Sequence, residues 1–230
     1  MMDRKYKVYV INLKKDKNRK KHIINELKKQ RIKNYEIIDA INGNALPLKE
    51  LRSKTYKNKY NKNPWNTKMS PGQIGCALSH IKIYKLFIKT KFKVALILED
   101  DAIFINSFKN NLKKLIIDDF KSKKQITLIS ELKEFYHRPI NKRAEYELVN
   151  VTNAFFTHAY FINKNAAKSI ISFNYPVKTI ADNFVFFKIY CGIKIIGLNP
   201  FIVDQDKVNH HTTIFIKKEK LKKKFLFRKR

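Results

Sequence analysis

Three consecutive acidic residues, Glu99, Asp100 and Asp101, directly follow the apolar run Val94–Leu98. In an open α/β sheet, ligands bind beyond the carboxyl ends of the strands, so acids at such a junction lie at a binding crevice. Carboxylate oxygens are the hard donors that Mg²⁺ and Mn²⁺ prefer, above all where the metal also takes phosphate oxygens from a substrate. The junction therefore predicts a divalent metal site. The alternative is an acidic turn that caps the next helix.

The rest of the chain makes these acids an exception. Its 230 residues hold 50 Lys and Arg against 19 Asp and Glu, which gives a formal net charge of +31. Neighbouring carboxylates repel one another and raise each other's pKa unless a cation joins them. A bound Mg²⁺ or Mn²⁺ is the simplest such cation, and Asp101 and Asp100 are its predicted ligands. If the strand continues through the acids, alternation places Glu99 and Asp101 on one side and Asp100 on the other.

The positive charge itself has three interpretations. The positive charge can serve to bind nucleic acid or to hold the protein against an anionic membrane. It can also simply reflect the overall composition of a chain rich in Lys, Asn and Ile, without a function of its own. A basic nucleic-acid-binding protein is the alternative from a different functional class. It does not explain why three acids follow a buried strand, so no nucleic acid partner is expected.

Composition and length exclude other classes. A hydrophobic fraction of 44% argues against a disordered basic chain. The two cysteines, Cys76 and Cys191, make neither a disulfide framework nor a zinc knuckle. Both are expected as buried thiols, Cys76 on the apolar face of a helix. Neither a signal peptide nor an apolar run of membrane-spanning length is visible in the sequence. A cytoplasmic protein is therefore expected.

The elements that position the acids begin at the N-terminus. Lys7–Leu13 and Tyr35–Ala40 read as strands, and Asp16–Gln30 between them as an amphipathic helix, which together predict a βαβ unit and a parallel sheet. A further helix opens at Ser70 with Pro71 in its first turn and Gln73 placed to complete a capping box. Residues between Ile41 and Met69 are expected to form a long loop, in which Trp65 is an anchor or a sugar-stacking residue.

Alternating strands and helices continue toward the C-terminus. The expected strands are Phe92–Leu98, Gln125–Ser130, His158–Ile162 and Lys194–Leu198, and the expected helices are Asn106–Ile117, Lys164–Ser172 and Thr179–Tyr190. The sequence thus predicts an α/β fold with a mostly parallel central sheet flanked by helices.

Basic residues gather where the first strand meets its helix. Asn12 lies at the end of the strand, and Arg19 is one of several basic residues at the start of the helix. A nucleotide diphosphate can bind at such a helix N-terminus and on an Arg fork. Neither the glycine-rich dinucleotide motif nor the P-loop is present.

Four blocks of the sequence, in this order, resemble glycosyltransferase family 25, the lipooligosaccharide glycosyltransferases of Gram-negative bacteria with collagen galactosyltransferases as distant relatives. They are VYVINLKKDKNRKKHI at Val8–Ile23, SPGQIGCALSHIKIY at Ser70–Tyr84, LILEDDA at Leu96–Ala102, and THAYFINKNAAKSII at Thr157–Ile171 with ADNFVFF at Ala181–Phe187. Two positions depart from the family pattern. His158 stands where the family often has Gly, and Ala181 stands before Asp182 in place of Val or Pro.

The resemblance implies a GT-A-like nucleotide-sugar-binding domain, expected over residues 1–213. It also implies an inverting transfer of a sugar, commonly galactose, from a UDP-sugar, with a divalent metal at the Glu-Asp-Asp motif. The acceptor is expected to be a lipooligosaccharide or another surface glycan. A family member that has lost catalysis and only binds glycans is a further alternative.

Roles follow for individual residues. Asn12, Arg19, Glu99 and Asp100 are predicted to contact the donor, and the resemblance makes Ser79 and His80 donor-pocket candidates, with a structural histidine as the alternative for His80. A carboxylate must take the acceptor proton. Asp182 is the first choice for this base and Glu131 the second. His210 or His211 can complete a metal site.

The last residues, 214–230, form a basic and aromatic tail. Nine basic residues and one acid between Lys217 and Arg230 alternate with Leu and Phe. Such a segment suits binding to an anionic membrane surface, with a disordered tail as the alternative. An enzyme that extends a lipid-linked glycan is then expected on the inner face of the cell membrane.

Overall fold

The computed structural model describes residues 6–56, 69–105, 122–142, 146–154 and 157–206. The expected helix Asn106–Ile117, Trp65, His210, His211 and the tail 214–230 lie outside these residues. The division into a domain over 1–213 and a separate tail therefore stays a prediction.

The N-terminal βαβ unit is confirmed. It consists of β1 (Tyr6–Asn12), α1 (Lys17–Lys29) and β2 (Tyr35–Asp39). β1 lies between β2 and β3 (Val94–Glu99) and is parallel to both, so the carboxyl ends of the three strands meet at one edge of the sheet. This edge is the place where an α/β fold binds its ligands.

The central sheet has the strand order β2-β1-β3-β9-β5-β10-β8-β6 within the described residues, and β7 pairs with β8. The later strands are β5 (Gln125–Leu128), β6 (Glu134–Phe135), β7 (Asn141–Lys142), β8 (Glu147–Asn153), β9 (Ala159–Asn163) and β10 (Lys194–Asn199). β2, β1, β3, β5 and β10 point the same way, because β9 is antiparallel to both of its neighbours and β10 is parallel to β5. The predicted mostly parallel α/β sheet is confirmed, with β9 and β8 reversed.

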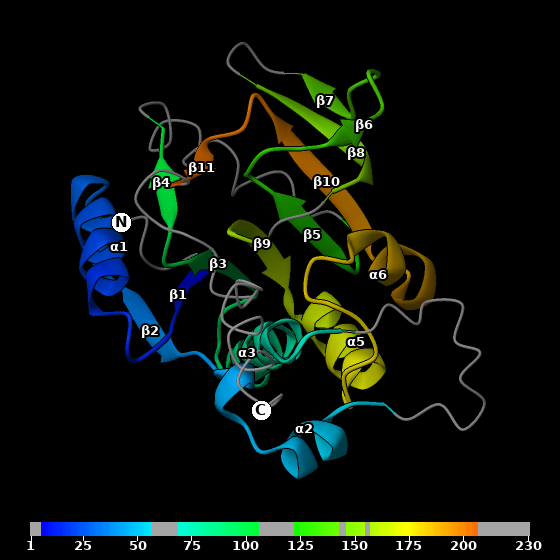
Figure 1. Ribbon diagram of the computed structural model, residues 1–230. Helices are drawn as coiled ribbons and strands as arrows, with labels where there is room; N and C mark the ends of the chain where they lie inside the picture. Colours follow the sequence, from blue (N-terminus) through cyan, green and yellow to red (C-terminus); the bar gives the residue numbers. More distant parts are fainter. Residues whose placement is uncertain (1–5, 57–68, 106–121, 143–145, 155–156, 207–230) are drawn as a thin grey trace, which may run out of the picture.

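Helices cover both faces of the sheet (Figure 1). α1 packs on one face, where Ile23 and Leu27 meet Val8, Val10 and Leu96. α3 (Pro71–Phe87), α5 (Lys164–Asn174) and α6 (Phe184–Cys191) cover the other face, onto which the alternate strand residues point. Ile23 and Leu27 are fully buried, and each such side chain stabilises the fold by about 1.5–3 kcal/mol.

The start of α3 has the predicted capping box. Ser70 Oγ accepts a hydrogen bond from the Gln73 backbone N–H at 3.2 Å, and Gln73 Oε1 accepts one from the Ser70 N–H at 2.8 Å. The expectation of a long loop after Ile41 is wrong for its first part. A 3₁₀ turn, η2 (Gly43–Ala45), and a short helix, α2 (Leu48–Lys54), occupy it.

Two glycines allow this segment to lie directly on α3. A Cβ built on Gly75 would stand 2.4 Å from the Gly43 nitrogen, and one built on Gly43 would stand 1.7 Å from the Pro71 carbonyl oxygen. Only glycine fits at such a backbone contact. The contact holds η2 beside the first turns of α3, where both border the carboxyl end of the sheet.

A small second sheet completes the molecule on the α1 side. It pairs β4 (Ala102–Phe104) with β11 (Val203–Gln205), which carries the end of the described chain back to the residues after β3. In the described parts of the chain, every helix is too short or too polar to cross a bilayer.

Candidate functional site

The three acids after β3 are divided between the two faces of the sheet. Glu99 is the last residue of β3 and points to the α3 face, as Ala95 and Ile97 do. The chain then turns at Asp100 and Asp101, and β4 begins at Ala102. Glu99 and Asp101 were expected to share a side only if the strand continued through the acids, and this condition is not met because β3 ends at Glu99. Asp100 and Asp101 both meet α1.

We call Asn12, Arg19, Asp100, Asp101 and Gln205 the Arg19 cluster. Arg19 Nε donates to Asp100 Oδ1 at 2.6 Å, and its Nη2 donates to Asp101 Oδ2 at 2.9 Å. Asn12 Nδ2 lies 2.6 Å from Asp100 Oδ2, and Gln205 Nε2 lies 3.0 Å from Asp101 Oδ2. The cation that joins the two carboxylates is therefore the guanidinium of Arg19.

Asn12 and the two acids of the Arg19 cluster are buried, and Arg19 and Gln205 are partly buried. Asp100 is 5% exposed and Asp101 is 3% exposed. Burial raises the pKa of Asp100, and the opposing effect of Arg19 and Asn12 is smaller. Burial lowers the pKa of Arg19, but the charges of Asp100 and Asp101 outweigh it, so the net shift is upward. Asp101 Oδ1 has no hydrogen-bond partner within the described residues.

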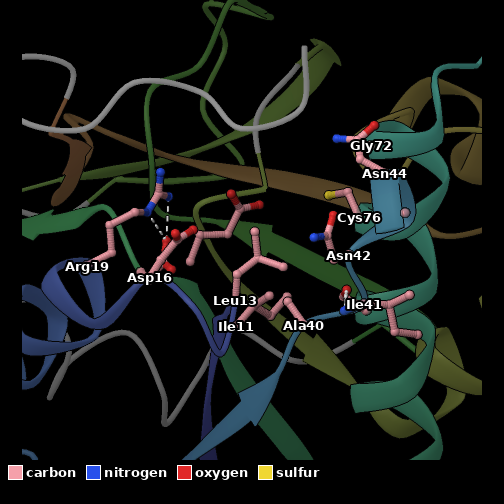
Figure 2. A pocket seen from close by; sticks show the side chains of 14 residues that line it. Ile11, Leu13, Asp16, Arg19, Ala40, Ile41, Asn42, Asn44, Gly72 and Cys76 are labelled. Carbon is pink, nitrogen blue, oxygen red and sulfur yellow. Dashed lines mark hydrogen bonds and ion pairs between the residues drawn. The ribbon is translucent and has the colours of Figure 1, made fainter. Parts of the chain in front are cut away.

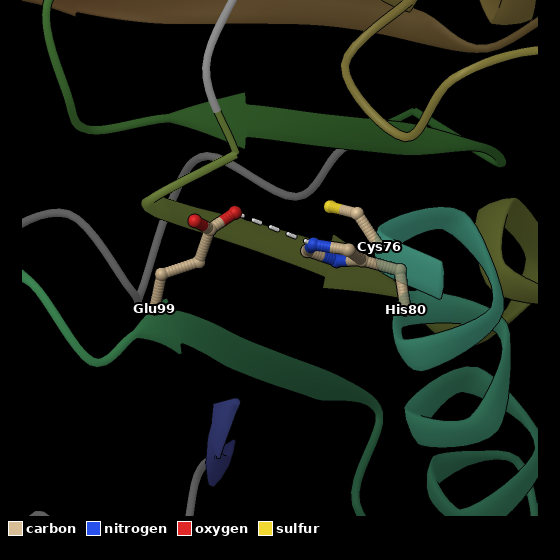
Figure 3. A group of neighbouring side chains, drawn as sticks. All are labelled: Cys76, His80 and Glu99. Atoms are coloured by element: carbon tan, nitrogen blue, oxygen red, sulfur yellow. Dashed lines mark ion pairs between the residues drawn. The ribbon is translucent and has the colours of Figure 1, made fainter. Parts of the chain in front are cut away.

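On the other face, Cys76 and His80 of α3 meet Glu99; we call these three residues the Cys76 group (Figure 3). Their ligand atoms lie within 4.8 Å of one another, and His80 Nε2 lies 3.5 Å from Glu99 Oε1. Thr157 Oγ1 donates a hydrogen bond to the same Glu99 oxygen. His80 Nδ1 lies 2.7 Å from the Tyr160 hydroxyl, which in turn lies 2.6 Å from that of Tyr84.

The pKa values of Glu99 and Cys76 differ from those of ordinary side chains. Burial by itself raises the pKa of Glu99, but the neighbouring imidazole of His80 and the hydrogen bond from Thr157 outweigh it and hold the pKa at about 2. Glu99 is thus a firmly ionised carboxylate. Burial raises the pKa of the Cys76 thiol well above its ordinary value, and the nearby carboxylates of Glu99 and Asp182 raise it further.

A pocket lies between the Arg19 cluster and α3 (Figure 2). It contains about 580 Å³ of space, part of it open to solvent. Its walls come from the ends of β1 and β3, the start of α1, the segment after β2, and the first turns of α3: Ile11, Leu13, Asp16, Arg19, Ala40, Ile41, Asn42, Gly43, Asn44, Gly72, Cys76, Ser79, Glu99 and Asp100. The pocket thus opens at the edge that the fold predicts.

The predicted donor residues are brought together here. Arg19, Ser79, Glu99 and Asp100 line the pocket, Asn12 and Asp101 lie in the Arg19 cluster behind it, and His80 lies behind Cys76. The Ser79 hydroxyl accepts a hydrogen bond from the Ile41 N–H at 2.8 Å and donates one to the Gly75 carbonyl at 2.7 Å. Ser79 therefore holds the wall of the pocket in place.

The two predicted bases lie elsewhere. Neither Asp182 nor Glu131 is among the described residues that line the pocket. Asp182 immediately precedes the N-cap of α6 and is near enough to Cys76 to raise the pKa of its thiol. Glu131 is exposed and lies three residues after Leu128, the last residue of β5. Asp182 is therefore the nearer candidate.

Three residues that line the pocket, Cys76, Asn42 and Asn44, were not predicted from the sequence. Cys76 was expected in the core, but it lines the pocket. The spacing Cys76-x-x-x-His80 on a helix was the signal for its partner, because residues four apart share a face. The side chains of Asn42 and Asn44 also border the pocket, and no pattern in a polar segment distinguished them.

Comparisons with known proteins identify the family to which this chain is similar. The family model "Glycosyltransferase family 25 (LPS biosynthesis protein)" matches residues 5–185. A Haemophilus influenzae protein whose name assigns it to the glycosyltransferases is 31% identical over 209 residues, which cover 88% of this chain and 71% of the relative. The mouse procollagen galactosyltransferase 2 is 28% identical over 173 residues, or 71% of this chain. This chain spans only 27% of that longer protein.

Solved structures are more distant. A glycosyltransferase involved in the glycosylation of the major capsid of PBCV-1 aligns with a TM-score of 0.40 and 13% identity, over 88% of this chain and 94% of that one. The inositol-1-phosphate CTP transferase from T. maritima aligns with a TM-score of 0.45 and 11% identity, over 94% of this chain and 93% of that one. Similarity at this level carries no argument about activity.

Proposed function

The chain belongs to glycosyltransferase family 25, and from this premise we propose that it is an inverting transferase that moves galactose from UDP-galactose to a surface glycan. One observation carries the proposal. A pocket lined by ionised Glu99 and by Asp100 opens at the shared carboxyl edge of the parallel strands β1, β2 and β3. Galactose as the donor sugar is supported by the names of the procollagen galactosyltransferases.

The pocket suits a nucleotide sugar for physical reasons. Two helices begin beside it, because Asp16 and Arg19 at the start of α1 and Gly72 at the start of α3 line its walls. The N–H groups at a helix N-terminus attract a diphosphate. The amides of Asn42 and Asn44 offer both donors and acceptors to the nucleoside or the sugar.

A divalent ion is part of the proposal, and the donor set of Asp100 and Asp101 fits one. Their oxygens are hard ligands, and Asp101 Oδ1 is a buried acceptor without a hydrogen-bond partner in the described part of the chain. Mg²⁺ or Mn²⁺ on these carboxylates would supply positive charge to the leaving diphosphate. Arg19 already neutralises both acids, so metal affinity depends on how readily its guanidinium moves away from the two carboxylates.

A residue of this chain must remove the proton of the acceptor hydroxyl. In a single displacement, the acceptor oxygen forms a bond to C1 of the sugar while the bond from C1 to the diphosphate oxygen breaks and UDP leaves. The hydroxyl proton passes to a carboxylate. We assign that role to Asp182, with Glu131 second, because Asp182 lies just before α6 and near Cys76 at the pocket wall, whereas Glu131 is exposed beyond the end of β5. The variants Asp182→Asn and Glu131→Gln distinguish the two.

A lipooligosaccharide or another lipid-linked glycan is the proposed acceptor, in keeping with the family's description as LPS biosynthesis proteins. The basic, aromatic residues 214–230 would then hold the enzyme on the anionic inner face of the cell membrane. Pelleting with anionic liposomes, of the full chain and of a chain that ends at Thr213, tests this. Equal pelleting of the two removes the membrane role of the tail.

The alternative within the family is a glycan-binding member without catalysis, and the pairing of both acids with Arg19 is the observation that favours it. The deciding experiment measures UDP binding by calorimetry and hydrolysis of a panel of UDP-sugars, with Mn²⁺ or with a chelator. We expect UDP to bind and UDP-galactose to turn over only with metal, and Asp101→Asn to lose the turnover. UDP binding without turnover supports the inactive alternative, whereas failure of every UDP-sugar to bind overturns the nucleotide site.

A further inference from the structure

The Cys76 group combines side chains that are typical of a different metal from the one expected at the acids. Cys76 and His80 are four residues apart on α3, so both point from the same face of the helix. Glu99 reaches them from the end of β3, because α3 packs on the face to which Glu99 points. Figure 3 shows the thiol, the imidazole and the carboxylate converging on one space.

The imidazole of His80 provides the second, independent observation. His80 is 2% exposed, and its Nε2 has no hydrogen-bond partner within the described residues. The 3.5 Å from Nε2 to Glu99 Oε1 exceeds the roughly 2.7–3.2 Å of an N–H···O hydrogen bond. It is close to the separation of about 3.4 Å that follows for two ligands of a tetrahedral zinc ion with bonds of about 2.0–2.1 Å.

Hydrogen bonds from neighbouring side chains orient His80 and Glu99, as is usual for metal ligands. A metal-bound histidine generally uses its other ring nitrogen in a hydrogen bond that fixes the ring. Here His80 Nδ1 lies 2.7 Å from the Tyr160 hydroxyl, and the Thr157 hydroxyl donates to the carboxylate of Glu99. Both ligands are thus oriented by partners outside the group.

We propose that Cys76, His80 and Glu99 bind a Zn²⁺-type ion at the wall of the pocket. Thiolate and imidazole favour zinc or cobalt over magnesium. Binding replaces the proton of the Cys76 thiol, which passes to solvent. Three protein ligands leave a fourth position for water, and this position is reached from the pocket because Cys76 and Glu99 line it. The site is separate from the carboxylate oxygens of Asp100 and Asp101.

Cobalt provides a direct test on the full chain, and its outcome does not depend on transferase activity. The protein is treated with chelator, desalted and titrated with Co²⁺. We expect one equivalent to bind with the sulfur-to-cobalt charge-transfer band and the intense visible bands of a four-coordinate ion, and Zn²⁺ to displace it. Cys76→Ser should abolish the charge-transfer band, and His80→Gln should weaken binding at least about tenfold. Failure of the wild-type chain to bind Co²⁺ overturns the proposal.

Two matched variants separate this site from other ligands. Cys191→Ser removes the other free thiol, and Asp101→Asn changes the acid cluster. Both should keep the charge-transfer band, and its loss in either would contradict the assignment. If Cys76→Ser does not fold, alkylation of the wild-type chain is followed by mass spectrometry instead. Zn²⁺ should protect Cys76 but not Cys191, and equal rates for Cys76 with and without Zn²⁺ would overturn the site.

Discussion

The end of β3 has two chemically different sides. On the α1 side, Asp100 and Asp101 share the guanidinium of Arg19, and the amides of Asn12 and Gln205 each add a hydrogen bond to one of the two acids. On the α3 side, Glu99 faces Cys76 and His80, whose Nε2 is buried without a hydrogen-bond partner in the described residues. The chain turns immediately after Glu99, and this one turn separates the two chemistries.

With the proposed zinc site, a single acidic run would serve two purposes. Buried charges that are already paired stabilise a fold chiefly because removal of one partner leaves the other uncompensated. The Arg19 cluster is such an arrangement. Ligand atoms that converge without completing hydrogen bonds instead favour an added ion. We therefore expect loss of Arg19 on the α1 side to lower stability most, and substitution of Cys76 or His80 on the α3 side to act mainly on zinc binding.

The largest effect is expected for Arg19→Met. This change leaves Asp100 and Asp101 buried without their cation and should lower the free energy of unfolding by about 3–5 kcal/mol, measured by urea denaturation at pH 7. Lys20→Met removes a neighbouring exposed charge and should change it little. Added Mn²⁺ should stabilise the Arg19 variant more than the wild-type protein, because the carboxylates then lack a competitor. Equal losses in the two variants would show that the cluster is not structural.

Gly75→Ala tests the packing that supports the α3 side. The new methyl would lie 2.4 Å from the Gly43 nitrogen and 2.5 Å from the Ile41 carbonyl oxygen, and backbone atoms cannot yield as a side chain can. We expect a loss of about 1–3 kcal/mol in urea denaturation. The segment that carries Asn42 and Asn44 should shift, so UDP affinity should also fall. Unchanged stability and affinity would mean that the pocket wall adapts freely.

Much of this arrangement could be predicted from the sequence. The apolar strands, the βαβ order and the Ser70 capping box are local patterns, and each was confirmed. The location of Asp101 could not be predicted, because it depends on the residue at which β3 ends and on pairing of β4 with β11, about a hundred residues later. The reversed strand β9 likewise depends on partners far away in the chain.

For the candidate site, the sequence predicted which residues matter better than it predicted which of them contact one another. Arg19 was assigned to a diphosphate, yet it pairs with the acids that were assigned to a metal. Both assignments used the correct charges, but the sequence alone does not show that α1 brings them together. Cys76 was placed in the core because its helix face is apolar, whereas only the packing of α3 on β3 shows that it meets Glu99.

Thr157→Val has a smaller effect and should make stability more sensitive to acid. The low pKa of Glu99, about 2 in the folded protein against 4.5 for an ordinary glutamate, stabilises the fold above about pH 4.5. That contribution is lost as the pH falls toward 2. Loss of the Thr157 hydroxyl raises the folded pKa, so stability at pH 7 should fall by about 1–2 kcal/mol. Acid unfolding, followed by circular dichroism, should begin at higher pH in the variant. An unchanged acid transition would contradict the role of the Thr157 hydroxyl in lowering the pKa of Glu99.

Cys76→Ser should have the smallest effect on stability, and it sharpens the comparison most. Cys76 is partly exposed at the pocket wall and its thiol has no charge to leave uncompensated, because burial keeps its pKa well above the ordinary value. We therefore expect a change within about 0.5 kcal/mol in urea denaturation without metal. With Zn²⁺ present, the wild-type chain should become more stable than the variant, since an ion that binds only the folded state adds its binding free energy. A loss of several kcal/mol without metal would mean that the α3 side is structural like the α1 side.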